Sequence, residues 1–260
     1  MKKRPEADFS SPVCQPYFAK GDSHAVLLLH GFTGSAAHMR VLAEGLAAQG
    51  FTVRSINLPG HATRMDDMRH CTWQDWLNAA KEEFTRLKAE YEFVSVAGLS
   101  MGGCLALMLA EQNDPTAVVA ISAPMGVQNR MMPLAGVASL FVPEVSWEER
   151  KDDALDARYD KGYPGFPTKS AVGLNRIIRE ARANLCAVTC PVLVVQSDGD
   201  ETIRPESMQI ILDGVSSTKK ARLCLKDVPH VCTISREGNR IAQQVGEFLR
   251  LAQKEEAAAK

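Results

Sequence analysis

The sequence lacks the features that mark several large classes of protein. No apolar run approaches the roughly 20 residues that a membrane-spanning helix needs. The charges almost cancel, with 30 Lys and Arg against 31 Asp and Glu, so we expect no nucleic-acid partner. Internal repeats and low-complexity stretches are also missing. What remains is an ordinary globular composition, and 260 residues allow one or two domains.

The start of the chain lacks the apolar segment of a signal peptide. Positive charge at Lys2–Arg4 is followed by Glu6 and Asp8, where an apolar stretch should lie. The seven cysteines are odd in number, so we expect a cytoplasmic protein with reduced thiols. Cys186 and Cys190 have no second Cys or His pair at zinc spacing nearby, so we expect no metal site.

Short aliphatic runs alternate with helical patterns along most of the chain. The runs are Ala25–Leu29, Val53–Ile56, Val94–Ala97, Val118–Ile121, Val192–Gln196 and Ala221–Leu225. The helical patterns are Met39–Gln49, Trp73–Glu90, Gly102–Gln112, Pro205–Leu212 and Asn239–Gln253. Most runs are apolar without a period of two, which is typical of strands covered on both faces. The alternation predicts an α/β fold with a mostly parallel sheet and right-handed crossovers.

One long interval carries no strand signal, and it predicts a lid or cap at 124–188 within a single domain of residues 1–260. It holds an apolar run from Met131 to Val142, a charged run over 147–153 and a helical pattern near 170–184. The charged run indicates a solvated face. The apolar run is interpreted as a lid helix packed on the core, or as an acyl-chain groove with Met131 and Met132 at its entrance.

The segment Gly98-Leu99-Ser100-Met101-Gly102-Gly103 matches the pattern G-x-S-x-G. It follows one predicted strand and opens a very apolar helix, which is the strand–turn–helix context of a nucleophile elbow. The glycines relieve crowding around a strained serine, and the helix N-terminus directs its dipole towards a developing oxyanion. This context favours Ser100 as a nucleophile over a bystander serine in a glycine-rich turn.

A second loop, His30-Gly31-Phe32-Thr33-Gly34, comes directly after an apolar strand. In α/β-hydrolases this loop supplies one oxyanion N–H and the residue after the serine supplies the other. The expected donors are therefore the backbone N–H groups of Phe32 and Met101. We expect the His30 ring to hold the loop by hydrogen bonds, and the Phe32 ring could also line the acyl pocket.

A serine nucleophile needs a base and an acid that orients the base. On this fold the chain order is serine, acid, histidine, and His230 is the only histidine after Ser100. Three carboxylates compete in the loop after the strand at 192–196, and we favour Asp200 over Asp198 and Glu201. For Asp198 we favour a turn-stabilising role.

These motifs together resemble the serine α/β-hydrolase superfamily and, within it, the small bacterial carboxylesterases and monoacylglycerol lipases. The resemblance covers about 17–249 and also includes Leu58-Pro59-Gly60-His61. It implies the α/β-hydrolase fold, a mostly parallel central sheet flanked by helices, with a helical lid inserted after the sixth strand. It also implies no cofactor, a triad and an oxyanion hole. The residues so assigned are Ser100, Asp200 and His230 for the triad, and Phe32 and Met101 for the hole.

The chain departs from the family pattern in two loops. Pro229 stands where a glycine commonly precedes the catalytic histidine, and Ala62 stands where a glycine often follows the histidine of the Pro-Gly-His stretch. His61 is interpreted as structural or pocket-lining. Cys232 lies two residues beyond His230, and we favour an inert packing thiol over one that makes the site thiol-sensitive.

The expected activity is hydrolysis of carboxylic esters with short to medium acyl chains through an acyl-enzyme. Monoacylglycerol lipase is the alternative, and a peptidase, a C–C bond hydrolase or a non-catalytic ligand receptor is less favoured. The expected partner is a small-molecule ester, and the composition leaves room for a homodimer.

Overall fold

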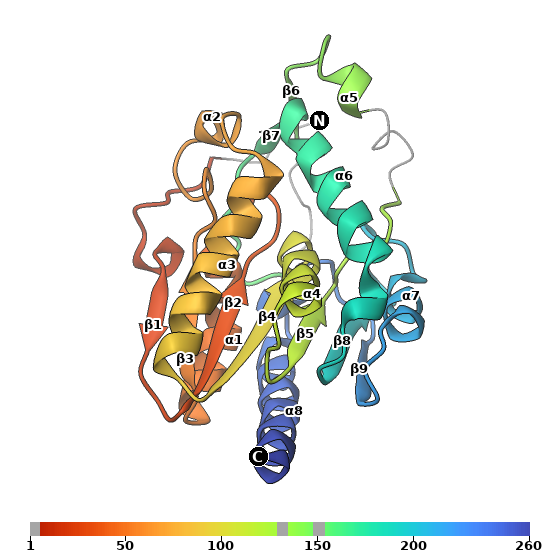
Figure 1. The fold of residues 1–260 in the computed structure, drawn as a ribbon. Coiled ribbons are helices and arrows are strands. Elements are labelled where there is room, and N and C mark those ends of the chain that lie inside the picture. The colour runs from red at the N-terminus through yellow and green to blue at the C-terminus, as the bar shows by residue number, and fades with distance from the viewer. Residues whose placement is uncertain (1–5, 129–134, 148–153) are drawn as a thin grey trace.

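A computed structural model describes residues 6–128, 135–147 and 154–260, and a seven-stranded sheet forms the centre of this part of the chain (Figure 1). Its strand order is β1-β3-β2-β4-β5-β8-β9. The strands are β1 (Tyr17–Ala19), β2 (His24–Leu29), β3 (Thr52–Ile56), β4 (Phe93–Leu99), β5 (Val118–Ile121), β8 (Val192–Ser197) and β9 (Lys220–Leu225). β1 runs antiparallel to β3, and the other neighbouring pairs are parallel. The predicted α/β class and mostly parallel sheet are confirmed.

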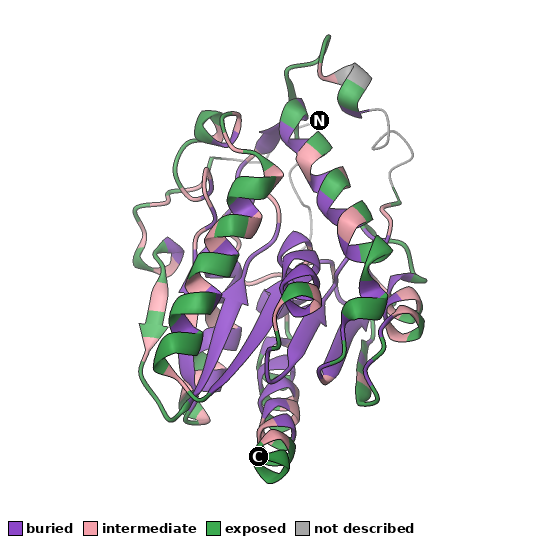
Figure 2. Ribbon diagram, viewed as in Figure 1, coloured by how far each residue is buried: buried purple, intermediate pink, exposed green. Residues whose placement is uncertain are grey.

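The central strands β2, β4, β5 and β8 are buried along their whole length, as their unbroken apolar runs predict (Figure 2). The edge strand β1 was not predicted. It has only three residues, too short an apolar run to predict a strand, and Phe18 at its middle is 51% exposed. All six predicted strands are present, with ends shifted by no more than two residues.

Helices cover both faces of the sheet. They are α1 (Arg40–Ala48), α2 (Met65–Met68), α3 (Trp73–Glu90), α4 (Met101–Gln112), α5 (Ala135–Ala138), α6 (Thr168–Ala183), α7 (Ser207–Gly214) and α8 (Gly238–Ala259). One apolar cluster joins the sheet to α3, α4 and α6, and a second joins it to α1 and α8. α3 spans the predicted residues because Thr72 caps its N-terminus, with a reciprocal bond between Asp75 and the Thr72 N–H.

The expected insertion lies between β5 and β8. Five strands of the sheet precede the insertion in the described residues, one fewer than the family resemblance implies, so the insertion follows the fifth strand in chain order and not a sixth. It contains α5, α6 and an antiparallel pair, β6 (Glu144–Ser146) with β7 (Gly165–Pro167). The pair was not predicted, because each strand has three residues and 18 residues separate them. Met131, Met132 and most of the charged run lie outside the described residues.

Candidate active site

Ser100 lies at the sharp turn where β4 ends and α4 begins. Its backbone has φ +55° and ψ −117°, a strained conformation for a residue with a side chain. Its N–H donates to the carbonyl of Ile121 on β5 at 2.8 Å, which fixes the turn to the sheet. A Cβ at Gly98 would lie 2.0 Å from the carbonyl oxygen of Gly102, so only glycine allows the turn to close this tightly.

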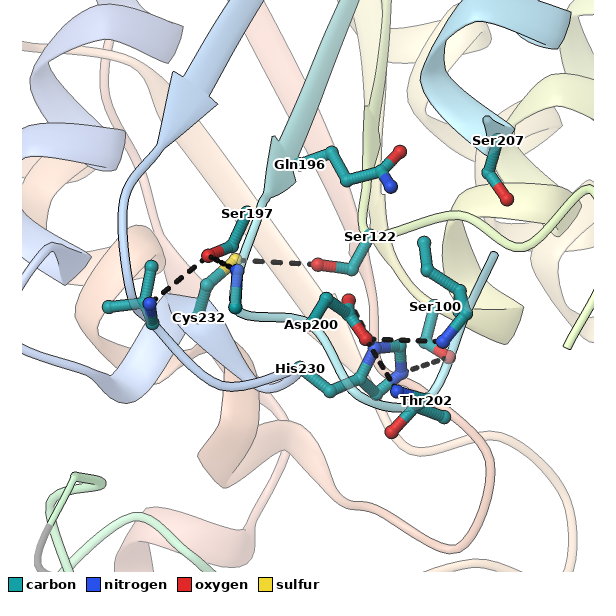
Figure 3. Close-up of polar contacts among 12 residues, drawn as sticks. Ser100, Ser122, Gln196, Ser197, Asp200, Thr202, Ser207, His230 and Cys232 are labelled. Atoms are coloured by element: carbon teal, nitrogen blue, oxygen red, sulfur yellow. Dashed lines mark hydrogen bonds and ion pairs between the residues drawn. The ribbon is translucent and has the colours of Figure 1, made fainter. Parts of the chain in front are cut away.

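The structure brings together the three residues predicted for the triad. His230 lies in the loop after β9, and its Nε2 is 2.8 Å from the Oγ of Ser100. Its Nδ1 is 2.8 Å from the Oδ2 of Asp200, which comes from the loop after β8. Figure 3 shows this continuous chain of hydrogen bonds. Asp200 and His230 are both buried, so little water competes for these contacts.

The carboxylate of Asp200 is held from two sides. Its Oδ1 accepts the backbone N–H groups of Thr202 at 2.9 Å and Ile203 at 3.2 Å. Burial would raise the pKa of Asp200, but the contact with His230 and the two N–H bonds outweigh it and hold the pKa below its usual value. Asp200 is therefore ionised at neutral pH, and the Nδ1–H of His230 donates to it.

The other two carboxylates of this loop lie in different surroundings. Asp198 accepts the N–H of Asp227 at 2.8 Å, so it ties the acid loop to the histidine loop, where we expected a local turn. Glu201 is exposed. Ser197, which the sequence analysis did not single out, joins the same two loops, because its Oγ accepts the N–H of Val228 at 3.1 Å. A serine at a strand end has no distinctive sequence signal.

The two backbone donors expected for an oxyanion come from the start of α4 and from the loop after β2. Met101 is the first residue of α4. Phe32 occupies a turn closed by the Gly34 N–H to the Gly31 carbonyl at 3.1 Å, and a Cβ on Gly31 would lie 3.2 Å from the Cβ of Ser100. Within the described ranges, no hydrogen bond uses the backbone N–H of Phe32 or Met101. Both donors are therefore available to a ligand.

Two buried histidines support the loops around the site. His30 Nε2 accepts the Leu58 N–H at 3.0 Å, so its Nδ1 carries the proton and donates to the Gly31 carbonyl at 2.8 Å. Burial lowers the pKa of His30 well below its usual value, so the ring is neutral. The ring of His61 packs near Trp76 and Tyr163, and burial lowers its pKa to about 4. These contacts match the loop-holding interpretation of His30 and the structural interpretation of His61.

Cys232 is fully buried behind the site, with its Sγ 3.6 Å from the Oγ of Ser122 (Figure 3). Burial raises the pKa of its thiol to about 12, so the reactive thiolate is scarce at neutral pH. These surroundings favour the inert packing interpretation.

In the described residues, no group of three or more His, Cys, Asp or Glu side chains could hold a metal ion. None of the described helices is long and apolar enough to cross a membrane.

Known proteins resemble this chain over most of its length. The family model described as "Serine aminopeptidase, S33" matches residues 22–236. A thermostable monoacylglycerol lipase of Bacillus sp. (strain H-257) is 34% identical, over 90% of this chain and 93% of that protein. A carboxylesterase of Bacillus subtilis (strain 168) is 30% identical, over 90% of this chain and 96% of that protein.

Solved structures share the fold over most of this chain. A structure from the study of the metagenome-derived lipolytic enzymes LipS and LipT has a TM-score of 0.86 and 29% identity, over 92% of this chain and 98% of that chain. The monoacylglycerol lipase of Paleococcus ferrophilus shares the fold, with a TM-score of 0.74 and 19% identity, over 92% of this chain and 99% of that chain. The chain belongs to the serine α/β-hydrolase superfamily, in the family described as serine aminopeptidase S33.

Proposed function

We propose that this hydrolase cleaves carboxylic esters with short to medium acyl chains, with Ser100 as nucleophile, His230 as general base and Asp200 as the group that orients the base. The observation that carries the proposal is the pair of 2.8 Å contacts from His230 to Ser100 and to Asp200. Membership of the superfamily and relatives that are a carboxylesterase and a monoacylglycerol lipase support ester hydrolysis as the class of reaction.

The first half of the reaction forms an acyl-enzyme. Nε2 of His230 takes the proton of the Ser100 hydroxyl while Oγ forms a bond to the ester carbonyl carbon. The ionised Asp200 stabilises the imidazolium that results. When the tetrahedral intermediate collapses, the bond to the alcohol oxygen breaks and the leaving alkoxide takes the proton from His230. Water then attacks the acyl-enzyme with the same proton transfers, which releases the acid and restores Ser100.

The negative charge of the tetrahedral intermediate falls on the former carbonyl oxygen. The N–H groups of Phe32 and Met101 would bind it, assisted by the dipole at the N-terminus of α4. One such donor is typically worth about 10²–10³ in rate. Neither N–H is used by another acceptor in the described ranges, so both would be available when substrate binds.

Aromatic side chains beside Phe32 support an apolar acyl site. The Phe32 ring packs edge-on against Phe166 of β7 at 5.5 Å between centroids, and against Trp76 of α3 at 6.0 Å. Ala135 and Ala171 complete a small apolar cluster there. An uncharged acyl chain would bury well against these side chains, whereas a charged one would lose hydration without a partner.

Monoacylglycerol is the second candidate substrate. The 34% identical relative is a monoacylglycerol lipase, and Leu140 and Phe141 of the insertion are 77% and 80% exposed. Exposed apolar side chains of this kind favour contact with a lipid substrate.

A homodimer and a cytoplasmic location are also proposals. Sedimentation of the purified protein checks the first, and fractionation of cells that express it checks the second.

A panel of substrates tests the proposed specificity. It would contain p-nitrophenyl esters of increasing acyl length, a monoacylglycerol series, and matched thioesters and amides. We expect kcat/KM to be highest for esters with short to medium acyl chains. A maximum at long-chain monoacylglycerols would favour the lipase, and amide turnover above ester turnover would favour a peptidase. Labelling by a fluorophosphonate, mapped to one peptide, would identify the nucleophile independently of the substrate.

A further inference from the structure

The turn that presents the Phe32 N–H contains a strained residue. Thr33 has φ +62°, in the left-handed region where a β-branched residue is an outlier. The Gly34 N–H to Gly31 carbonyl bond closes this turn, but it does not restrain the Thr33 carbonyl. Strained conformations persist only where the surrounding structure holds them. The contacts of Thr33 and its neighbours therefore show what holds the turn.

Those contacts come from a short segment of the insertion, residues 160–163, which we call the cap strap. The N–H of Tyr163 donates to the Thr33 carbonyl at 2.8 Å. The hydroxyl of Ser35 donates to the Lys161 carbonyl at 2.8 Å. A Cβ on Gly162 would lie 2.9 Å from the Thr33 carbonyl oxygen, so the two backbones approach as closely as glycine permits. The cap strap is thus hydrogen-bonded to Thr33 and Ser35, just after Phe32.

The cap strap is itself anchored through the side chain of Tyr163. This side chain is 1% exposed, and its hydroxyl oxygen lies 2.8 Å from the Gly60 carbonyl oxygen, to which it donates. The same oxygen accepts the N–H of Thr63 at 3.2 Å. The contacts fix Tyr163 to the loop that follows β3, which belongs to the main body of the fold. The main body of the fold therefore helps to set the position of the cap strap.

We propose that the cap strap holds the oxyanion turn in its working conformation and that Gly162 and Tyr163 are positioning residues for the Phe32 N–H. This inference rests on the proposed function, because it assumes that this N–H binds the oxyanion. A donor is effective only when it points at the developing charge, and a displacement of about 1 Å can cost about 10² in rate. A part of the insertion therefore supports the chemical step by positioning a donor.

The test pairs two substitutions in the insertion. Gly162→Ala adds a methyl group against the Thr33 carbonyl, whereas Gly136→Ala adds one where no atom lies within 4 Å. Both variants and the wild type would be assayed with p-nitrophenyl butyrate and its thionoester. Sulfur accepts hydrogen bonds poorly, so the ratio of the oxo to the thiono rate reports how well the oxyanion is stabilised. Fluorophosphonate labelling taken to completion would give the concentration of active enzyme.

For Gly162→Ala we expect kcat on the oxo ester to fall about tenfold or more, with KM within about twofold and a smaller oxo-to-thiono ratio. Gly136→Ala should match the wild type. An unchanged ratio in folded Gly162→Ala, with or without a change in KM, would overturn the inference. If Gly162→Ala does not fold, Ser35→Ala removes the contact to the Lys161 carbonyl together with the bond from the Ala37 N–H, and the same change in the ratio decides.

A Ser100→Ala variant separates this inference from the proposed function. If Ser100→Ala is inactive while Gly162→Ala keeps the wild-type ratio, the nucleophile stands and only the role of the cap strap fails. If Ser100→Ala hydrolyses p-nitrophenyl butyrate at the wild-type rate, the proposed function fails first and the cap strap has no oxyanion to position.

Discussion

Asp200 determines which nitrogen of His230 carries the proton. Its ionised carboxylate accepts the Nδ1–H, and this leaves the lone pair of Nε2 facing the Oγ of Ser100. The N–H groups of Thr202 and Ile203 hold the carboxylate independently of the ring. The candidate chemistry therefore depends on a proton at Nδ1 of His230, and replacing Asp200 by asparagine can move that proton to Nε2.

We predict that Asp200→Asn lowers kcat by about 10⁴, because an amide NH₂ facing Nδ1 favours the wrong tautomer of His230. The matched control is Asp198→Asn, in which the amide oxygen can still accept the Asp227 N–H. This control should retain kcat within about threefold. Steady-state kinetics on p-nitrophenyl butyrate measures both, and equal losses in the two variants would contradict the assignment of the acid.

Ala62 has a backbone conformation that is unfavourable for a residue with a Cβ. It has φ +55°, which costs a residue with a Cβ about 1–2 kcal/mol. We predict that Ala62→Gly raises the free energy of unfolding by about 0.5 kcal/mol, after the larger entropy of glycine in the unfolded chain is subtracted. Ala79→Gly within α3 should instead lower it by about 1 kcal/mol. Urea denaturation measures both, and a loss at both sites would show that Ala62 is unstrained.

At the scale of elements, α3 illustrates how a local signal fixes a boundary. Thr72 accepts the N–H of Asp75, and the Asp75 carboxylate accepts the N–H of Thr72 at 2.7 Å. The helix then buries Trp76 and Phe84 against the sheet. Loss of the cap should therefore reduce stability without changing the site.

We predict that Thr72→Ala lowers the free energy of unfolding by about 1 kcal/mol. Thr85→Ala is the control, because Thr85 is exposed within the same helix and its hydroxyl donates to the carbonyl of Lys81 in the preceding turn. It should change stability by less than about 0.5 kcal/mol. Thermal and urea unfolding would show the difference, and equal effects would mean that the capping box contributes nothing.

Elements with a strong local pattern could be predicted, and those made by distant contacts could not. Apolar runs predict the strands at the centre of the sheet. The glycines around Ser100 and the apolar helix after it predict the nucleophile. The β6–β7 pair depends on residues far apart in the chain, and neither strand has its own signal. The hydrogen bond from the Tyr163 N–H to the Thr33 carbonyl likewise joins backbone groups 130 residues apart, and no side-chain pattern predicts it.

At the scale of the whole molecule, buried histidines make folding depend on pH. Burial lowers the pKa of His24 and of His61 to about 4, and it also lowers the pKa of His30 well below its usual value. In the unfolded chain these rings bind protons below pH 6.5. Between about pH 6.5 and 4 the unfolded state therefore binds more protons than the folded state, so stability decreases as the pH falls through this range.

We predict that the free energy of unfolding falls by about 1.5 kcal/mol for each of His24 and His61 between pH 6.5 and pH 5. Urea denaturation at a series of pH values measures this slope. His24→Gln should reduce it, because one buried imidazole is removed, and His70→Gln at an exposed position should leave it unchanged. A stability that is constant from pH 7 to pH 5 would contradict the account.

The whole fold serves to bring three loops to one point, since Ser100, Asp200 and His230 follow β4, β8 and β9. The most direct test of the central claim compares the wild type with Ser100→Ala on p-nitrophenyl butyrate, at equal concentrations of folded protein. We predict that the variant loses about 10⁴-fold or more of the rate. Equal rates for the two proteins would contradict the claim that Ser100 is the nucleophile of an esterase.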